Sequence, residues 1–481
     1  MGINNNGDRA VIPLIINNES VVTDTTFEVQ NPATGELLDR CAGASVDDAN
    51  RAVATARAAF PGWSKTNPYE RRAILTKAAE IMASRKEELI RYQMEETGAG
   101  RMFTEKTFQL GVDFLSNFAA MIPTVEGKIP TLAQEGESAM VVKQPYGVVL
   151  GIAPWNAPYI LGTRAIALPL AAGNTAILKG SELSPRCFWA IGDIFRQAGL
   201  PAGCLNVIYH RSSDAAAVTN ALIAHPDVRK ISFTGSTIVG SIIASTAGKY
   251  IKPVLLELGG KASAIVLDDA NLEKAAMGCA LGSFMHTGQI CMSTERIVVQ
   301  RAVAGKFQNL LVEVSEKLFG KNVPAPYLVT AAAVKKNRDL VADAVSKGAE
   351  VVFGNPKASE SCANSLRPVI VGGVTKDMDL YATESFGPTV SLIVVDSEEE
   401  AIELANDTEY GLTSAVFTSN LFRGLRIAKQ IESGAVHINS LTVHDESTLP
   451  HGGWKSSGFG RFGGTAGYDE WLQTKTITWV E

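Results

Sequence analysis

Val148-Val-Leu-Gly-Ile152 begins a pattern in which short apolar runs alternate with helical stretches. Further apolar runs lie at residues 175–178, 205–208, 230–233 and 254–256, and helical stretches lie at residues 185–198 and 237–247. Strands separated by helices of this length are typical of parallel βαβ units with right-handed crossovers. The sequence therefore predicts an α/β fold built on a doubly wound sheet.

Polar and small residues follow several of these apolar runs. Asn156, Lys179, Gly235 with Ser236, and Glu257 all lie where a predicted strand ends. In doubly wound sheets, ligands bind beyond the carboxyl ends of the strands. We therefore expect these residues to face a ligand.

A second region of the same kind extends from about residue 263 to residue 439. Its apolar runs lie at residues 264–267, 297–299, 351–353, 390–395, 415–417 and 436–438. Cys291 belongs to this region, whereas Asn156 and Lys179 belong to the first. We therefore expect two doubly wound parallel-sheet domains with the active site between them.

The first part of the chain predicts short strands followed by long helices. The strands are expected at residues 13–16 and 27–29. Ser45 is a suitable N-cap for a helix that extends to about residue 60. A second helix is expected from about residue 70 to residue 97, ending at Gly98 because glycine readily adopts the left-handed conformation.

The composition excludes several classes of protein. A chain of 481 residues exceeds what one hydrophobic core usually supports, so we expect more than one domain. The net charge of −6, with no dense cluster of Lys and Arg, argues against a nucleic-acid partner.

No apolar run reaches the roughly 18 residues of a membrane span, and residues 1–6 lack the apolar segment of a signal peptide. With six cysteines and no CxxC pair, a cytoplasmic location is expected.

Cys291 lies in the run His286-Thr-Gly-Gln-Ile-Cys-Met-Ser293. The glycine and polar residues around it suit an exposed loop better than a helix interior. Most single cysteines are inert core residues, so this context is what makes Cys291 a candidate nucleophile. The other five cysteines lack such a context and are interpreted as structural: Cys41, Cys187, Cys204, Cys279 and Cys362.

Two segments match glycine-rich phosphate-binding patterns. Gly458-Phe-Gly-Arg-Phe-Gly463 fits GxGxxG, but only 18 residues follow it, too few for a βαβ unit, so a turn is expected. Phe233-Thr-Gly-Ser-Thr-Ile-Val-Gly240 joins a strand to a helix whose free N–H groups suit a pyrophosphate, although a plain helix start fits equally well. The six histidines show no HxxxH or HExxH spacing, so no metal site is predicted.

Seven motifs occur in a fixed order along nearly the whole chain. They are Pro154-Trp-Asn156, Lys179-Gly-Ser-Glu182, Phe233-Thr-Gly-Ser236, Glu257-Leu-Gly-Gly-Lys261, Gly288-Gln-Ile-Cys291, Glu384-Ser-Phe-Gly-Pro388 and Gly452-Gly-Trp-Lys-Ser-Ser-Gly458. Together they resemble the motif series of the NAD(P)-dependent aldehyde dehydrogenase superfamily. The resemblance implies a Rossmann-like NAD-binding domain (residues 1–130 and 144–257), a catalytic domain (258–450) and small antiparallel β arms (131–143 and 465–481). Such arms would join subunits into a homodimer or a homotetramer.

The resemblance assigns a covalent mechanism to three residues. The Cys291 thiolate would add to the aldehyde carbon, since a tetrahedral oxyanion releases hydride more readily than a planar carbonyl. The Asn156 amide and the Cys291 N–H would stabilise that oxyanion. Glu257 would act as the general base that activates water for hydrolysis of the thioacyl-enzyme. We expect burial among neighbouring leucines to raise the pKa of Glu257 above its ordinary value.

The resemblance also implies a cofactor site. Lys179 and Glu182 resemble the pair that holds the adenosine ribose, and a carboxylate there repels a 2′-phosphate, so NAD is expected over NADP. The other residues implied for the cofactor are Ile152, Trp155, Gly235, Ser236, Glu384 and Phe386.

Residues 151–164 and 286–296 are most similar to the salicylaldehyde, benzaldehyde and vanillin dehydrogenase branch, which implies an aromatic aldehyde substrate. The residues implied for its pocket are Tyr159, Leu161, Arg164, Ile290, Met292 and His451. Tyr159 fits ordinary core packing equally well, and Arg164 would either reach a ring substituent or form an internal salt bridge. His451 occupies a place where the family often has Phe, and the segment at residues 319–327 is abbreviated, so both leave the specificity open.

Other functions remain open at the level of the sequence. An aliphatic aldehyde or a semialdehyde is an alternative substrate, and a thioester hydrolase or a biosynthetic enzyme on the same scaffold would use Cys291 without net hydride transfer. A structural protein that binds NAD without chemistry is a further alternative. The presence of Cys291, Glu257 and Asn156 together argues against that last possibility.

Overall fold

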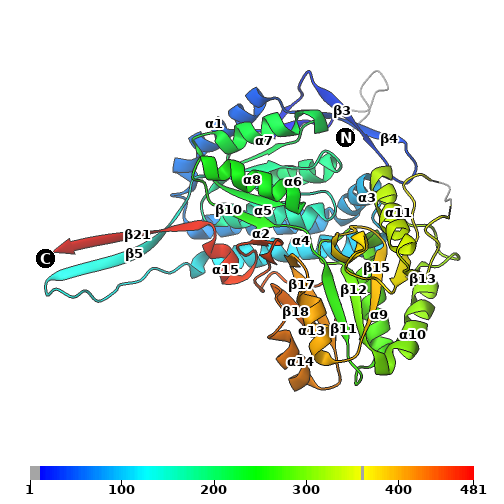
Figure 1. The fold of residues 1–481 in the computed structure, drawn as a ribbon. Coiled ribbons are helices and arrows are strands. Elements are labelled where there is room, and N and C mark those ends of the chain that lie inside the picture. Colours follow the sequence, from blue (N-terminus) through cyan, green and yellow to red (C-terminus); the bar gives the residue numbers. More distant parts are fainter. Residues whose placement is uncertain (1–10, 359–361, 481) are drawn as a thin grey trace.

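The computed structural model describes residues 11–358 and 362–480. Two large sheets lie in separate halves of the molecule, each flanked by helices, and an antiparallel arm projects from the body (Figure 1). The predicted α/β fold class is confirmed. Residues 1–6, in which no signal peptide is expected, lie outside the described residues.

The first sheet carries the strands predicted from the alternating pattern. In spatial order they are β2 (Glu19–Val21), β1 (Leu14–Ile16), β8 (Leu205–Ile208), β7 (Thr175–Lys179), β6 (Val148–Ile152), β9 (Val228–Thr234), β10 (Val254–Glu257) and β20 (Gly458–Phe459). β8, β7, β6, β9 and β10 run parallel, whereas β1, β2 and β20 are joined to their neighbours by antiparallel pairing. Every residue of β6, β7 and β8 is buried, as expected of parallel strands with helices on both faces.

Long helices surround this sheet. They are α1 (Val46–Trp63), α2 (Pro68–Ser84), α3 (Lys86–Thr97), α4 (Arg101–Met121), α5 (Pro158–Ala171), α6 (Pro185–Gln197), α7 (Ala215–Ala224) and α8 (Thr237–Lys249). α1 begins after Ser45 as predicted, and a capping box joins Ser45 to Asp48. α4 was not anticipated from the sequence.

The prediction of one continuous helix over residues 70–97 is wrong. Arg85 separates α2 from α3, because its φ of −99° and ψ of 19° interrupt the helical backbone. Its guanidinium forms ion pairs with Glu88 at 2.9 Å and with the buried Asp193 at 2.8 Å. The end of α3 agrees with the prediction, since Gly98 has a φ of 70°.

The second sheet contains, in spatial order, β13 (Glu350–Phe353), β14 (Val369–Gly372), β15 (Thr389–Val395), β12 (Thr294–Gln300), β11 (Ala262–Val266), β17 (Thr413–Phe417) and β18 (Ala435–Ile438). All of its pairings are parallel except that of β13 with β14. β14 is the one strand of this sheet that the sequence pattern did not indicate. Its helices are α9 (Leu272–Phe284), α10 (Arg301–Phe319), α11 (Ala331–Ser346), α12 (Asp379–Ala382), α13 (Glu398–Asn406) and α14 (Leu421–Ala428).

The projecting arm consists of β5 (Glu137–Pro145) and β21 (Leu472–Val480), with the chain end near its tip (Figure 1). The two strands pair antiparallel along their whole length, and β21 is largely exposed. The remaining elements are β3 (Thr26–Gln30) with β4 (Leu37–Ala42), β16 (Tyr410–Gly411) with β19 (Trp454–Lys455), α15 (Gly464–Asp469) and short 3-10 helices at Ile122–Thr124, Ser212–Asp214 and Met285–Gly288. The domain boundaries given above stay a prediction.

The GxGxxG match at residues 458–463 forms the edge strand β20 and the turn that follows it. Its three glycines, Gly458, Gly460 and Gly463, all have positive φ angles, which L side chains rarely adopt. β20 pairs with β10 beside Glu257 and so closes one edge of the first sheet. Among the described residues, no helix combines the length and apolarity needed to cross a membrane.

Candidate active site

Two adjoining cavities share one wall. Asn156, Leu161, Glu257 and Cys291 line both of them. The first, here called the strand-end cavity, is also lined by Pro154, Trp155, Thr234, Gly235, Ser236, Leu258, Gly259, Lys336, Glu384 and Phe386. The second, here called the apolar cavity, is also lined by Phe103, Lys106, Thr107, Leu110, Ala157, Ile160, Arg164, Met285, Ile290, Met292, Val443 and Asp445. A reactive group on the shared wall therefore reaches ligands in both cavities.

The loop before Cys291 has an unusual backbone. His286, Thr287 and Gly288 have φ angles of 49°, 58° and 72° in succession. A Cβ on Gly288 would lie 2.0 Å from the Gly387 carbonyl oxygen, so this position accepts only glycine. Such strain persists only where the surroundings hold it, and here it presents the partly exposed Cys291 to the cavities.

Gln289 holds this loop in place from inside. Its side-chain amide donates to the carbonyls of His286 and Tyr327 at 3.2 and 3.3 Å, and its oxygen accepts from the Val329 N–H at 2.9 Å. Its own carbonyl accepts from the Asn156 side-chain amide at 2.9 Å. One N–H of Asn156 is thus fixed, which orients the amide on the shared wall.

Glu257 is the last residue of β10 and is 1 % exposed. The Cys291 thiol donates to its Oε1 at 3.6 Å. The Arg164 guanidinium pairs with Oε2, and His451 Nε2 lies 3.2 Å from Oε1. The predicted nucleophile and base are therefore in contact, with two basic side chains on the other sides of the carboxylate.

The expectation that burial raises the pKa of Glu257 is wrong. Burial does act in that direction, but the charges of Arg164 and His451 outweigh it and hold the pKa at about 2, below the ordinary 4.5. The apolar neighbours along the strand favour a raised pKa, whereas the two basic side chains that lower it come from distant parts of the chain. Glu257 is therefore an ionised carboxylate in this structure.

The surroundings of the Cys291 thiol raise its pKa, whereas those of Glu257 lower the pKa of the carboxyl. Burial and the nearby Glu257 charge raise its pKa well above the ordinary 9.0, although Arg164 opposes them. The thiol is therefore protonated when the cavities hold no ligand. A base must remove this proton before the sulfur can attack, because the thiolate is the nucleophile.

Arg164 forms an internal salt bridge, one of the two roles predicted for it. It is 1 % exposed on α5 and, besides Glu257, pairs with Asp445 at 2.8 Å. The Phe462 ring lies under the guanidinium, 4.6 Å from its carbon. Arg164 also borders the apolar cavity, but its charge is already matched by two carboxylates.

Most of the residues predicted for the cofactor meet in the strand-end cavity: Trp155, Gly235, Ser236, Glu384 and Phe386. Ser236 caps α8, whose first N–H groups are free to bind an anion. Glu384 accepts from the Gly260 N–H at 2.8 Å, and burial raises its pKa to about 7.

The other predicted cofactor residues do not line this cavity. Ile152 and Lys179 are buried at the ends of β6 and β7, and Glu182 accepts a hydrogen bond from the Ser212 hydroxyl at 3.0 Å. Burial lowers the pKa of Lys179 to about 8, and no described residue forms a hydrogen bond or an ion pair with its ammonium. An unpartnered buried ammonium at a strand end fits a ligand rich in hydroxyl groups and phosphate, as a dinucleotide is.

The substrate pocket differs from the prediction in two residues. Leu161, Arg164, Ile290 and Met292 line the apolar cavity, but Tyr159 and His451 do not. Tyr159 is fully buried, and its hydroxyl donates to the Leu89 carbonyl at 2.8 Å, so it is a core residue. His451 lies behind Glu257 instead.

One wall of the apolar cavity was missed because it comes from α4. The wall consists of Phe103, Lys106, Thr107 and Leu110. Their spacing of three, four and seven residues marks one face of a helix, and this signal was available in the sequence. Nothing local in the sequence relates this face to the pocket, since more than 180 residues separate it from Cys291.

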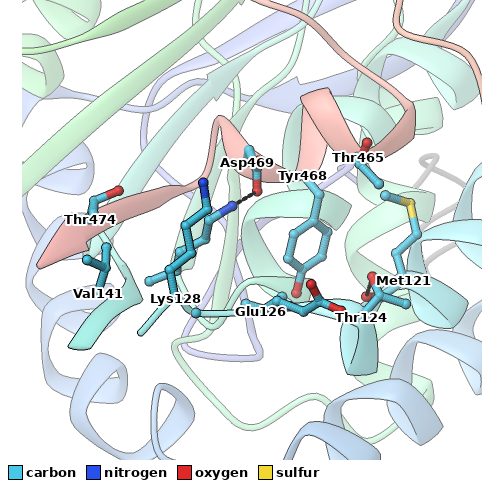
Figure 2. A pocket seen from close by; sticks show the side chains of 12 residues that line it. Met121, Thr124, Glu126, Lys128, Val141, Thr465, Tyr468, Asp469 and Thr474 are labelled. Carbon is cyan, nitrogen blue, oxygen red and sulfur yellow. Dashed lines mark hydrogen bonds and ion pairs between the residues drawn. The ribbon is translucent and has the colours of Figure 1, made fainter. Parts of the chain in front are cut away.

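A separate cavity lies where the arm leaves the body. Tyr468 and Asp469 of α15 face Lys128 and Val141 across it, and Asp469 pairs with Lys143 (Figure 2). It contains none of the residues predicted for catalysis, cofactor or substrate. No cluster of metal-binding side chains is found among the described residues.

Replacing Glu257 with glutamine tests the charge balance of the site. Because the folded-state pKa of about 2 lies below the ordinary 4.5, the ionised form stabilises the fold above about pH 4.5, and this stabilisation is lost as the pH falls toward 2. We expect Glu257→Gln to lower the free energy of unfolding by about 3 kcal/mol near neutral pH, less as the medium becomes acidic. Urea unfolding of both proteins between about pH 7 and about pH 3.5 measures this. The difference in the free energy of unfolding between the two proteins should become smaller below about pH 4.5. If it does not, the pairing of ionised Glu257 with its basic neighbours is contradicted.

Comparison with known proteins agrees with this geometry. Residues 19–477 match the model of the aldehyde dehydrogenase family. The chain is 45 % identical over 474 residues to vanillin dehydrogenase from Pseudomonas fluorescens, covering 97 % of each protein. The crystal structure of a salicylaldehyde dehydrogenase from Pseudomonas putida complexed with salicylaldehyde superposes with a TM-score of 0.94 at 38 % identity, covering 98 % of both chains.

A betaine aldehyde dehydrogenase from Staphylococcus aureus, solved in complex with NAD+, superposes with a TM-score of 0.93 at 28 % identity, covering 97 % of this chain and 94 % of that one. The resemblance inferred from the seven motifs is thus confirmed. The chain belongs to the aldehyde dehydrogenase family and is an oxidoreductase that converts aldehydes to carboxylic acids with NAD(P).

Proposed function

We propose that the protein oxidises an aromatic aldehyde to the carboxylic acid, with NAD as the cofactor, through a covalent intermediate on Cys291. The observation that carries this proposal is the shared wall of the two cavities. There Cys291, Glu257 and Asn156 lie between an apolar cavity and the strand-end cavity.

The first step is addition of sulfur to the aldehyde. Glu257 Oε1, 3.6 Å from the sulfur, takes the thiol proton as the new C–S bond forms. The carbonyl electrons move to oxygen and give an oxyanion. The second N–H of the Asn156 amide and the Cys291 backbone N–H are its donors, since the first amide N–H is held by the Gln289 carbonyl.

The strand-end cavity holds the cofactor in this proposal. Ser236 and Trp155 would border the pyrophosphate, Glu384 and Phe386 would hold the nicotinamide end, and Gly235 also lines this cavity. Outside the cavity, Lys179 and Glu182 would hold the adenosine ribose, next to Ile152 at the end of β6. Bound NAD supplies the acceptor for the hydride that the substrate carbon loses, which leaves a thioester on Cys291. Once the thiol proton has left Glu257 for solvent, Glu257 takes a proton from water. The hydroxide attacks the thioester, the acid is released, and the departing Cys291 sulfur takes that proton back from Glu257.

The apolar cavity supports an aromatic substrate. Apolar side chains form most of its wall: Phe103, Leu110, Ile160, Leu161, Met285, Ile290, Met292 and Val443. Flat apolar rings suit such a wall. The vanillin and salicylaldehyde dehydrogenases, which are among the relatives of this chain, act on aromatic aldehydes by their names.

A semialdehyde is the second candidate substrate. Lys106 on α4 lines the same cavity and is exposed, and its ammonium has no ion-pair partner among the described residues. A free cation at that position suits a substrate with a carboxylate at the end away from the aldehyde.

We propose that β5 and β21 join subunits into a homodimer or a homotetramer. Support comes from the exposed side chains of β21, including Ile477 and Trp479, on a two-stranded sheet with open edges. A cytoplasmic location is also proposed, and the six cysteines support it because all of them are free thiols.

A panel of aldehydes tests the proposed function. We expect kcat/KM for benzaldehyde and its hydroxylated derivatives to exceed that for aliphatic aldehydes and semialdehydes by about tenfold or more, because a flat ring fills the apolar wall. The formation of NADH, followed by its absorbance, is the measurement. Preference for a semialdehyde would replace the first candidate with the second, and no NADH from any aldehyde would reject both.

Replacing Asn156 with alanine tests the oxyanion donor. We expect kcat to fall by about 10² to 10³, since removal of one such donor costs this much. Asn420→Ala, which removes the cap of α14 far from the cavities, is the matched control and should leave kcat unchanged. An Asn156→Ala protein with the parent kcat would remove the amide from the mechanism.

Replacing Glu182 with glutamine tests the cofactor preference. Loss of a negative charge near the ribose should raise kcat/KM with NADP relative to NAD by about tenfold, or roughly 1.4 kcal/mol. Glu80→Gln on the exposed face of α2 is the control. An unchanged ratio of the two kcat/KM values would show that Glu182 does not face the 2′ position.

A further inference from the structure

His451 is placed to act on the same carboxylate oxygen as Cys291. Glu257 Oε1 lies 3.6 Å from the Cys291 sulfur and 3.2 Å from His451 Nε2, while Arg164 occupies Oε2. On the far side of the imidazole, Asp445 Oδ1 lies 3.9 Å from Nδ1. The four groups thus lie in a row that leads from the partly exposed Cys291 through the buried Glu257 and His451 to Asp445.

This row answers a difficulty in the chemistry of Glu257. The Arg164 guanidinium, which pairs with Glu257 Oε2, lowers the pKa of this carboxyl, so the carboxyl retains a proton only weakly at neutral pH. A proton that arrives from the thiol therefore returns to sulfur unless a stronger base takes it from the carboxyl group. The imidazole is within hydrogen-bond distance of the oxygen that receives the proton.

We propose that His451 is a positioning residue that receives, through Glu257, the proton of the Cys291 thiol, with Asp445 stabilising the resulting imidazolium. The S–H bond breaks as the Oε1–H bond forms, and the Oε1–H bond then breaks as the Nε2–H bond forms. The products are thiolate, carboxylate and imidazolium, with no change in net charge or oxidation state. The inference rests on the roles of Cys291 and Glu257 in the proposed function.

The surroundings of His451 favour its protonated form. The groups that face it are Glu257 on β10, Arg164 on α5 and Asp445 in the loop after β18, with His437 on β18 and its neighbour His444 further away. Burial lowers the pKa of His451, but Asp445 and Glu257 outweigh burial and raise it above 6.5. Burial holds the pKa of His437 at about 4, so His437 stays neutral and does not compete.

The direction in which the reactivity of Cys291 changes with pH follows from this arrangement. Only the neutral imidazole accepts a proton, and its fraction rises with pH through a value above 6.5. The reactivity of Cys291 should therefore rise with pH and level off once His451 is neutral. Without an imidazole, hydroxide must remove the proton, and reactivity should rise about tenfold per pH unit without levelling off.

Alkylation of Cys291 by iodoacetamide tests the inference without an aldehyde. The rate is measured on the full-length protein between about pH 6 and about pH 10, and mass spectrometry of the modified peptide assigns it to Cys291. The parent protein should reach a plateau. His451→Phe should react about tenfold or more slowly near neutral pH and show no plateau.

Three further variants distinguish a His451 that accepts a proton from a His451 that only holds Glu257 in place. His451→Gln can keep a hydrogen bond to Glu257 but cannot hold a proton, so it should behave like His451→Phe. Asp445→Asn removes the anion behind the ring and should move the midpoint of the profile to lower pH. His444→Gln, in the same loop but away from Glu257, is the matched control and should match the parent.

A plateau in His451→Gln or His451→Phe at the parent's pH would overturn the inference. An alkylation profile of Asp445→Asn with the same midpoint pH as the parent would also overturn the inference. This second criterion applies even if the His451 variants do not fold. Aldehyde oxidation measured in parallel keeps the two proposals apart. A protein that shows the expected alkylation profiles but oxidises no aldehyde would retain the His451 inference and lose the proposed function.

Discussion

The buried ion pair between Arg164 and Glu257 is the interaction on which the site depends. Removing a carboxylate from water costs several kcal/mol, and Glu257 ends its strand with almost no exposure. The guanidinium of Arg164, on α5, offsets this cost by pairing with Glu257 through Nη2. Asp445 pairs with the other terminal nitrogen, Nη1. The ionised base beside Cys291 therefore results from contacts between segments that are distant in the sequence.

The two sheets contribute different parts to this site. Parallel strands of the first sheet end at Lys179 and Glu257, and Asn156 lies in the segment that follows β6, so these polar residues gather at one edge. The second half supplies Cys291 on a strained loop that only Gly288 permits. Because the nucleophile and the base come from different halves, the relative position of the halves fixes the 3.6 Å contact between them.

Much of the fold follows from local patterns in the sequence. The strands of the first sheet are short apolar runs with turn residues at their ends, and the N-cap at Ser45 is equally local. Features fixed by tertiary contacts were missed. The break at Arg85 is accompanied by an ion pair with Asp193 on α6, and β14 is an ordinary apolar run recognised only by its neighbours.

The same distinction holds for the site. Residue types and motif order indicated Cys291, Glu257 and Asn156, which the structure brings to one wall. Their electrostatics were not accessible, since the pKa of Glu257 is set by Arg164 and His451 rather than by the apolar neighbours on its own strand. For Tyr159 the sequence left the pocket and the core equally open, and the buried side chain, whose hydroxyl donates to the Leu89 carbonyl, has the core role.

The most direct test of the account is to trap the covalent intermediate. The parent protein, mixed with NAD and benzaldehyde and quenched with acid within the first turnover, should carry a benzoyl thioester on the peptide that contains Cys291, detected by mass spectrometry. Acid stops the hydrolysis of the thioester, and Cys291→Ala, which lacks the sulfur, should carry no acyl group on that peptide. An acyl group on another cysteine, or its absence while NADH still forms, would contradict a mechanism in which the Cys291 sulfur attacks the aldehyde.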